Sequence, residues 1–246
     1  MNGQWKTAAL GALGGAVLSV AIVFAAAWNG LLPGAGDRQI HDYLLAHPQL
    51  LADMNDKLQA QQEADEEAAR QKAVDKLGPA AFFDPKVAFV TGPADAKKTL
   101  VEFFDYNCPF CRASIPAVKK FYEENKGKAR FAFIEFPIKG PQSIIAAKAA
   151  LAARNQPDKY LPFHFALMNE DALVDENLVF ADAAKVGLDV AKLKADMADP
   201  AIAKSVDASL ALAKKAGVDG TPAFIVNGRV REGAVDDDLL KELSKG

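Results

Sequence analysis

The sequence predicts an α/β fold that carries an inserted helical subdomain and is preceded by an N-terminal membrane helix and a helical stalk. Three patterns predict it. A strand, a helix and a second strand follow one another in "TLVEFFDYNCPFCRASIPAVKKFYEENKGKARFAFIEFPI". A long helical stretch then separates these strands from the next strand. Ahead of them all lie an uncharged apolar segment and a long polar helix.

The composition is that of a globular protein. The chain has 246 residues, 50% of them hydrophobic, and a net charge of -3. A chain of this length and composition buries a sizeable core. The nearly balanced charge offers no broad positive surface to phosphate backbones, so the composition argues against nucleic acid as a partner.

Residues 1–36 form the first predicted region. After Lys6 no charged residue occurs up to residue 36, and residues 8–27 reach the length of about 20 residues that a membrane helix needs. Lys6 places the N-terminal side in the cytoplasm and sends the rest of the chain outward. Residues 25–27 also fit the small-residue pattern of a cleavage site. Two interpretations therefore remain, an uncleaved signal anchor and a cleaved signal peptide, and both export the body of the protein.

Residues 37–78 form the second predicted region, a helical stalk. We expect Asp37 to cap its first helix, and Pro48 to separate that helix from a second one near His47. The dipeptide Gly78-Pro79 ends the second helix.

The stalk carries an apolar seam with the alternating spacing of a coiled coil, and His47 is its one polar position. The seam consists of Ile40, Leu44, Leu51, Met54 and Leu58. Such a stripe needs a partner surface. Residues 37–76 are therefore either an oligomerisation region that joins copies of the chain, or a helix packed on its own domain, or a solvated spacer.

Residues 79–246 form the third predicted region. Its strands are "KVAFVTG", "TLVEFFDY" and "ARFAFIEFPI", with a helix at about 109–124 before the last of these. This order predicts a parallel pair with a right-handed crossover and a site at the C-terminal edge of the strands. Residues 141–215 show only helical patterning and exceed the roughly dozen residues that a crossover needs. They predict the helical insertion.

The last part of the chain predicts a hairpin and a closing helix. The strand "AFIV" leads into a turn at Asn227-Gly228, a pair that favours the tight turns of hairpins. A helix is expected from residue 236 to residue 244.

The two cysteines of the chain, Cys108 and Cys111, lie where a strand gives way to a helix. Pro109 suits the first helical position because its missing N–H has no partner there. The free amides and the positive end of the helix dipole then favour the thiolate of Cys108. Cys111, in the first turn, is placed to attack a mixed disulfide at Cys108. This hypothesis requires the sulfur of Cys108 to be accessible to solvent.

A metal site is the main competing interpretation. Structural zinc takes four ligands, whereas this chain offers one C-x-x-C pair and three histidines, His41, His47 and His164, at no paired ligand spacing. We therefore predict a redox pair and no metal ligand set. Handling of copper or zinc through the two thiolates remains as an alternative.

Three segments together resemble the DsbA family of bacterial thiol-disulfide oxidoreductases, which have a thioredoxin-like fold. They are "VEFFDYNCPFC", the helical insertion and "GVDGTPAFIVNG", and the resemblance covers most of residues 82–244. "IHDYLLAHPQLL" ahead of this domain is most similar to the ScsC-type branch, in which an N-terminal helical region forms oligomers.

The resemblance implies a periplasmic enzyme, either anchored in the inner membrane or soluble after signal cleavage. It implies a disulfide isomerase or reductase, with a disulfide oxidase as the alternative. Its substrates would be unfolded or misoxidised exported proteins, and a membrane thiol-disulfide partner would reset the pair. No cofactor is implied.

The resemblance also implies site residues beyond the two cysteines. Thr221-Pro222 matches the loop with a cis proline that binds an extended substrate segment, together with Pro109 and Phe110 beside the sulfur. Glu102 matches the buried acid of the family and would accept the proton of Cys111. From the residues alone, a buried acid with a raised pKa and a solvated edge position are both open for Glu102. Phe110 replaces the histidine of the best-known members, which predicts a less oxidising disulfide.

Overall fold

The computed structural model describes residues 20–26, 28 and 35–245. The chain divides into two compact units, Met1–Glu63 and Ala64–Gly246. Most of the predicted membrane segment, residues 8–27, lies outside the described residues. Within the described part of the chain, no helix is long and apolar enough to cross a membrane.

The first unit holds helix α2 (Ala35–Ala46) and the beginning of α3 (Gln49–Leu77). The predicted break at Pro48 is confirmed. Asp37 was predicted to cap the first helix, which is wrong: α2 already includes Ala35, so Asp37 lies in its first turn. The five apolar seam residues are exposed to between 47% and 77%. Among the described residues of the first unit, no other segment covers the seam.

The second unit is built on a five-stranded sheet with the strand order β1-β3-β2-β4-β5. β2 and β3 are parallel, and each of the other neighbouring pairs is antiparallel. The parallel pair and the hairpin after β4 are as predicted. The strands are β1 (Ala88–Thr91), β2 (Lys98–Phe104), β3 (Ala129–Glu135), β4 (Ala223–Val226) and β5 (Arg229–Glu232).

Two glycine-containing turns shape this sheet. Gly92, directly after β1, has φ +89°, and a Cβ there would collide with the carbonyl oxygen of Ala129. Only glycine allows this close approach of the chain to β3. Asn227 and Gly228 have φ 51° and 83°, which is the backbone of the predicted two-residue hairpin turn.

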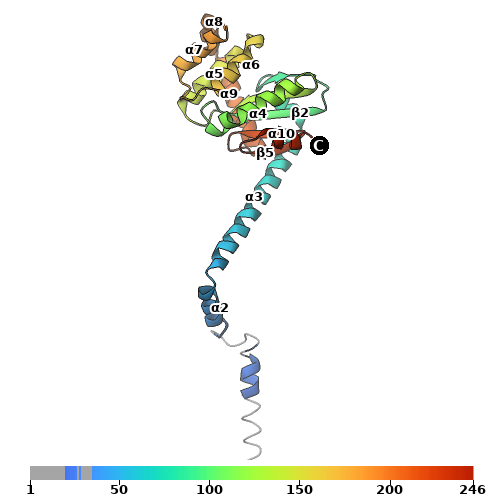
Figure 1. Cartoon of the computed structure of the whole chain (residues 1–246), viewed down its shortest axis with the longest axis vertical. Coiled ribbons are helices and arrows are strands. Elements are labelled where there is room, and N and C mark those ends of the chain that lie inside the picture. The colour runs from blue at the N-terminus through green and yellow to red at the C-terminus, as the bar shows by residue number, and fades with distance from the viewer. Residues whose placement is uncertain (1–19, 27, 29–34, 246) are drawn as a thin grey trace, which may run out of the picture. The chain divides into compact units, whose positions relative to one another are not determined.

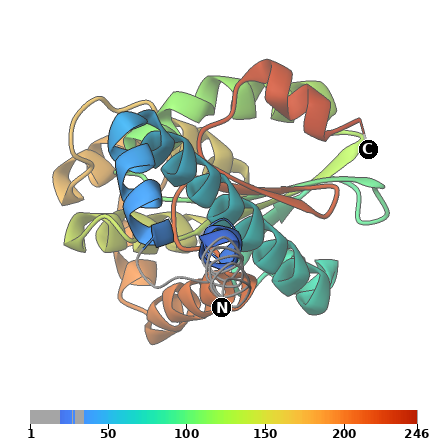
Figure 2. The same cartoon turned by 90° about the horizontal axis from the view of Figure 1, so that it is seen from below.

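Helix α4 (Pro109–Asn125) makes the crossover between β2 and β3, and five helices form the predicted insertion. These are α5 (Pro141–Ala153), α6 (Pro157–Met168), α7 (Glu176–Lys185), α8 (Val190–Met197) and α9 (Pro200–Ala216). A 3-10 helix, η1 (Pro79–Phe83), precedes the sheet, and α10 (Asp237–Leu243) ends the unit with Asp236 as its cap. Figure 1 shows α5 to α8 gathered on one side of this unit, and Figure 2 shows α10 beside α4.

The core has two layers because β2 is buried on both faces. Leu100 and Phe104 point into a layer that includes α4, α5 and α6, whereas Val101 and Phe103 point into a layer with η1 and the end of α9. Alternation along the strand puts Glu102 on the same face as Leu100 and Phe104. An acid therefore lies in the layer that also contains both cysteines.

The C-terminal turns of α3 pack on the edge of the sheet within the second unit. The Gln71 side-chain amide donates to the carbonyl of Gly228 at 2.9 Å and accepts from the N–H of Val230 at 3.0 Å. It satisfies main-chain groups that an edge strand would otherwise leave free. Arg70 adds an ion pair with Glu232 at 3.2 Å, and Val74 is buried.

Candidate active site

The turn between β2 and α4 places Cys108 at the N-terminus of the helix. Cys108 is the N-cap residue with extended backbone, and Pro109 takes the first helical position. The carboxylate of Asp105 fixes this turn by accepting bonds from the amide of Asn107 at 2.8 Å, from the amide of Ile138 at 2.7 Å and from the hydroxyl of Ser143 at 2.7 Å. The predicted switch from strand to helix is present.

The loop before β4 reaches the same sulfur from the far end of the chain. The thiol of Cys108 donates to the carbonyl oxygen of Thr221 at 3.1 Å, and the Thr221–Pro222 peptide bond is cis. The cis proline that the resemblance implied is therefore present. Cys108, Cys111, Thr221 and Pro222 form one site.

The environment of Cys108 lowers its pKa from 9.0 to about 5. A hydrogen bond from Cys111 is the largest cause. The side chain of Thr221 and the amides of Cys111 and Phe110 lower it further, against the opposing effect of burial. Hydrogen bonds to a charged group favour that charged form. Cys108 is thus mainly a thiolate at neutral pH, as the helix N-terminus predicts.

Ionisation changes the partners of the sulfur. The neutral thiol donates to the carbonyl of Thr221, but a thiolate has no proton to donate. The hydroxyl oxygen of Thr221 is buried and has no partner in the dithiol form. A hydroxyl that turns toward the sulfur supplies the donor that a thiolate needs. Thr221 therefore gives the thiol an acceptor, and its side chain lowers the pKa of Cys108.

The expected accessibility of Cys108 is wrong for this conformation. The residue has 0% exposed surface, because the loop of Thr221 and the first turn of α4 enclose the sulfur. A disulfide substrate must displace part of this cover before its sulfur reaches Cys108. Loss of the bond to the Thr221 carbonyl on ionisation removes one of the contacts that hold the sulfur in place.

Cys111 behaves in the opposite way. It is also 0% exposed, and burial raises the pKa of its thiol far above the ordinary value. The hydrogen bond that it gives to Cys108 and the charge of Glu102 raise the pKa further. Cys111 therefore keeps its proton until a base removes it.

Glu102 is a buried acid in the middle of the sheet. It pairs in register with Phe133 of β3 and Phe224 of β4, and it has 0% exposed surface. Neither carboxylate oxygen has a hydrogen-bond partner, and burial raises the pKa of Glu102 to about 8. The solvated edge position left open by the sequence is thus wrong. The charge of Glu102 acts on Cys111, so the two groups are electrostatically coupled.

Exposed hydrophobic side chains gather around the 105–108 turn. Of the described side chains between residues 64 and 245, four large hydrophobic ones are exposed: Phe110, Ile138, Ile144 and Leu173. Phe110 lies in the first turn of α4, two residues after Cys108, and it is the most exposed of the four at 63%. The amide of Ile138 donates to Asp105, and Ile144 and Leu173 each adjoin a residue that bonds to Asp105, Asn107 or Arg112.

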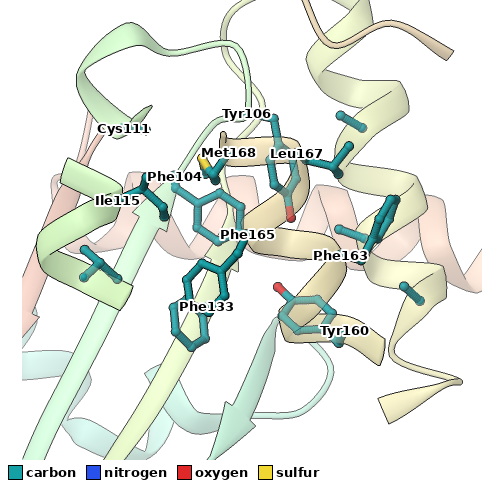
Figure 3. Close-up of a cluster of buried hydrophobic side chains, with 14 of the residues drawn as sticks. Phe104, Tyr106, Cys111, Ile115, Phe133, Tyr160, Phe163, Phe165, Leu167 and Met168 are labelled. Carbon is teal, nitrogen blue, oxygen red and sulfur yellow. The ribbon is translucent and has the colours of Figure 1, made fainter. Parts of the chain in front are cut away.

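The sequence did not reveal several residues that shape the site. Asp105 and Asn107 anchor the turn, and their polar character directly after a buried strand was the available signal. His164 was considered only as a metal ligand, but it is buried and lies 3.1 Å from the hydroxyl of Tyr106. Figure 3 shows Cys111, Tyr106 and Phe104 in one buried cluster. Among the described residues, no three or more His, Cys, Asp or Glu side chains form a group that could hold a metal ion.

Two protein families match this chain. Residues 85–245 match the family described as Thioredoxin, and residues 37–65 match the N-terminal domain of the copper resistance protein ScsC. A curated relative, the Na(+)/H(+) antiporter NhaA of Herminiimonas arsenicoxydans, is 34% identical over 153 residues. That match covers 62% of this chain and 24% of the antiporter. The chain thus spans about a quarter of the length of this relative.

Solved structures match over more of their own length. A thioredoxin-like oxidoreductase from Silicibacter pomeroyi is 39% identical, with a TM-score of 0.63 over 68% of this chain and 96% of that one. A mutant of ScsC from Proteus mirabilis is 27% identical, with a TM-score of 0.65 over 87% and 95%. The thiol-disulfide exchange protein alpha-DsbA2 from Wolbachia pipientis is 25% identical, with a TM-score of 0.66 over 73% and 96%.

The hydrogen bond between the two cysteines predicts a change in reactivity. Cys111→Ala removes the largest cause of the low pKa of Cys108, so we expect that pKa to rise by about one unit or more. The measurement is the thiolate absorbance against pH, because Cys108 is then the remaining thiol. Cys111→Ser keeps an O–H donor and is the matched control, with a smaller rise. Equal values in wild type and Cys111→Ala would contradict the assigned cause.

The raised pKa of Glu102 predicts the pH dependence of stability. Between its ordinary pKa of 4.5 and about 8, the folded chain keeps a proton that the unfolded chain has lost. Stability therefore falls as the pH rises through this window. Glu102→Gln cannot ionise, so we expect it to be more stable than wild type at pH 8 by on the order of 4 kcal/mol, with little difference at pH 4.

Urea unfolding at pH 4, 6 and 8 measures this difference. Glu67→Gln, which neutralises an exposed acid of α3, is the control and should follow wild type at each pH. If wild type and Glu102→Gln show parallel pH dependence, the pKa of Glu102 is not raised in the folded chain.

Proposed function

The chain belongs to the DsbA family of thiol-disulfide oxidoreductases, with a thioredoxin-like domain and an N-terminal segment of the ScsC type, and from this premise we propose that it exchanges disulfides with protein substrates through Cys108 and Cys111. One observation carries the proposal. Cys108 begins α4 and bonds to the loop before the cis Pro222, with Cys111 one turn away, and the pKa values of the two thiols are shifted in opposite directions.

The first step forms a mixed disulfide. The thiolate of Cys108 attacks one sulfur of a substrate disulfide, forms a bond to it and expels the other substrate sulfur as a thiolate. The cis-proline loop, through Thr221 and Pro222, holds the substrate segment, and Pro109 and Phe110 line the approach. The electron pair that leaves the broken S–S bond stays on the expelled sulfur, so no cofactor is needed.

The second step resolves the mixed disulfide. Glu102, when ionised, takes the proton of Cys111, and the resulting thiolate attacks the sulfur of Cys108. The substrate leaves as its second thiolate, reduced by two electrons, and the cysteine pair becomes a disulfide. A pKa of about 8 places Glu102 near the operating pH, where a base of this kind acts best. The reverse sequence oxidises a dithiol substrate.

We propose a disulfide isomerase or reductase rather than a strong oxidase. A stable thiolate stabilises the reduced form and makes the disulfide more oxidising. The pKa of Cys108, about 5, lies between roughly 3.5 in the strong oxidant DsbA and about 7 in thioredoxin. Phe110, in the place of a histidine, is consistent with this intermediate position. The pair can then both open and form disulfides.

Unfolded or misoxidised exported proteins are the proposed substrates. The four exposed hydrophobic residues defined above offer apolar contact to segments that a folded protein would bury, and Phe110 lies two residues from Cys108. The uncharged residues 7–36 support export to the periplasm, as a signal anchor in the inner membrane or as a cleaved signal peptide. A membrane thiol-disulfide partner would restore the pair.

The exposed seam of the first unit supports a homo-oligomer. Five large apolar side chains stand along α2 and the beginning of α3 with coiled-coil spacing. Two redox pairs in one assembly would be able to act on different disulfides of one substrate, which suits isomerisation. We propose that residues 37–76 form this contact, and that residues 79–246 form the catalytic domain with its insertion at 141–215.

Refolding of scrambled ribonuclease tests the proposed activity. We expect the wild-type protein to restore ribonuclease activity severalfold faster than the glutathione buffer alone, and Cys108→Ser to give only the buffer rate. Cys111→Ala should accumulate a mixed disulfide with the substrate, seen as a heavier band without reductant. If wild type and Cys108→Ser restore activity at the same rate, the proposed function is wrong.

The apolar seam generates a separate prediction. Leu44→Glu together with Leu51→Glu places charges in the seam, so we expect the assembly to dissociate and the isomerase rate to fall toward the buffer rate, while reduction of a small disulfide persists. Light scattering gives the mass, and the ribonuclease assay gives the rate. Ala60→Glu adds a charge to α3 outside the seam and should change neither. A wild-type protein that is monomeric throughout would refute the oligomer.

A further inference from the structure

Three buried polar residues lie next to the redox pair and take no part in the proposed exchange steps. Tyr106, Glu135 and His164 are each at most 1% exposed. The hydroxyl of Tyr106 lies 3.2 Å from Glu135 Oε1 and 3.1 Å from His164 Nδ1. They come from the turn after β2, from the end of β3 and from α6. This group therefore joins the strand before the redox pair to the helical insertion.

Both contacts of Tyr106 have the geometry of hydrogen bonds. Burial raises the pKa of Glu135 well above its ordinary value and lowers that of His164 to about 3, which in each case favours the neutral form. A tyrosine hydroxyl donates one proton and accepts others. The hydroxyl of Tyr106 donates to Glu135 Oε1, and it lies within hydrogen-bond distance of His164 Nδ1.

The main chain of Tyr106 is held from the opposite side. Arg112 of α4 donates from Nε to the carbonyl oxygen of Tyr106 at 2.9 Å, and its Nη2 donates to the side chain of Asn107 at 3.3 Å. Cys108 follows directly and donates its own amide to Asp105 at 3.0 Å. Tyr106 is thus fixed at its hydroxyl by the sheet and the insertion, and at its carbonyl by the helix that Cys108 begins.

We propose that the hydroxyl of Tyr106, held by Glu135 and His164, is a positioning group for Cys108, which aligns the sulfur with its donors by anchoring the 105–108 turn to the helical insertion. The inference deepens the proposed function and rests on it. Tyr106 touches neither substrate nor reacting atoms in this role. It acts through the turn, and His164 acts through Tyr106.

The direction of the effect follows from hydrogen-bond geometry. The donors to the thiolate are the thiol of Cys111, the side chain of Thr221 and two amides of α4. Hydrogen bonds weaken steeply when distance or angle departs from the optimum. A turn that is less firmly anchored therefore stabilises the thiolate less and raises the pKa of Cys108.

Tyr106→Phe keeps the ring and removes the hydroxyl. We expect the midpoint of the pH profile for alkylation of Cys108 by iodoacetamide to rise by about half a unit or more, which is a roughly threefold lower thiolate fraction well below the midpoint. A midpoint equal to that of wild type would overturn the proposal, whatever happens to the melting temperature.

Tyr160→Phe is the matched control for loss of a buried hydroxyl. Tyr160 is 1% exposed and donates to Glu135 Oε1 at 3.4 Å, but its hydroxyl forms no hydrogen bond with the 105–108 turn, so it lies outside the positioning group. Figure 3 shows the hydroxyl groups of Tyr106 and Tyr160 directed toward the same space between their rings. We expect this variant to lose stability and to keep the wild-type midpoint. A shift equal to that of Tyr106→Phe would overturn the proposal.

A double variant tests whether His164 acts through Tyr106. His164→Phe removes Nδ1 within an aromatic cluster and should raise the midpoint less than Tyr106→Phe, because Glu135 still binds the hydroxyl. Added to Tyr106→Phe, it should give no further shift, since the shared hydroxyl is already absent. An additive shift would overturn this part of the inference. If Tyr106→Phe fails to fold, His164→Phe alone carries the test, and an unchanged midpoint rejects the proposal.

The same titration separates failure of this inference from failure of the proposed function. A wild-type midpoint near that of a free thiol, together with no ribonuclease refolding, would reject the function itself. A low wild-type midpoint that Tyr106→Phe leaves unchanged would reject only the positioning role.

Discussion

One hydrogen bond, from the thiol of Cys111 to the sulfur of Cys108, creates the difference on which the site depends. Both cysteines are buried, and burial alone would raise the pKa of both. The shared bond lowers the pKa of the residue that accepts it and raises the pKa of the residue that gives it. Cys108 is therefore the nucleophile and Cys111 the protonated thiol, although only one helical turn separates the two residues.

That bond exists because the fold holds four chain segments together around one sulfur. The start of α4 supplies amides, the cis-proline loop supplies Thr221, and Asp105 fixes the turn by bonds to the segment after β3. The central place of β2 brings these segments together, since β3 and β4 flank it on either side. Glu102 is buried for the same reason. An acid on the middle strand has no route to water, and the raised pKa that results is what a base for Cys111 requires.

The sequence predicted the parts of this arrangement that depend on local chemistry. The strand-helix unit, the break at Pro48, the hairpin at Asn227-Gly228 and the helix N-terminus at Cys108 each follow from residues within a few positions of one another. The resemblance to a known family supplied the cis proline. Contacts between distant segments left no local signal. Gln71 donates a hydrogen bond to Gly228 of the hairpin, 157 residues further along the chain. His164 lies within hydrogen-bond distance of Tyr106, which is 58 residues away in sequence.

The burial of Cys108 shows most clearly why pattern alone was insufficient. A helix N-terminus predicts a stabilised thiolate. An exposed Cys108 sulfur was expected as well, because a nucleophile must meet its substrate. The structure separates the two properties, since the donors that stabilise the thiolate are also the groups that cover it. Thr221 contributes to both properties, because its carbonyl accepts a bond from the thiol and its side chain lowers the pKa of Cys108. A substrate disulfide that enters beside Pro222 thus meets a sulfur whose charge has already weakened one contact of its cover.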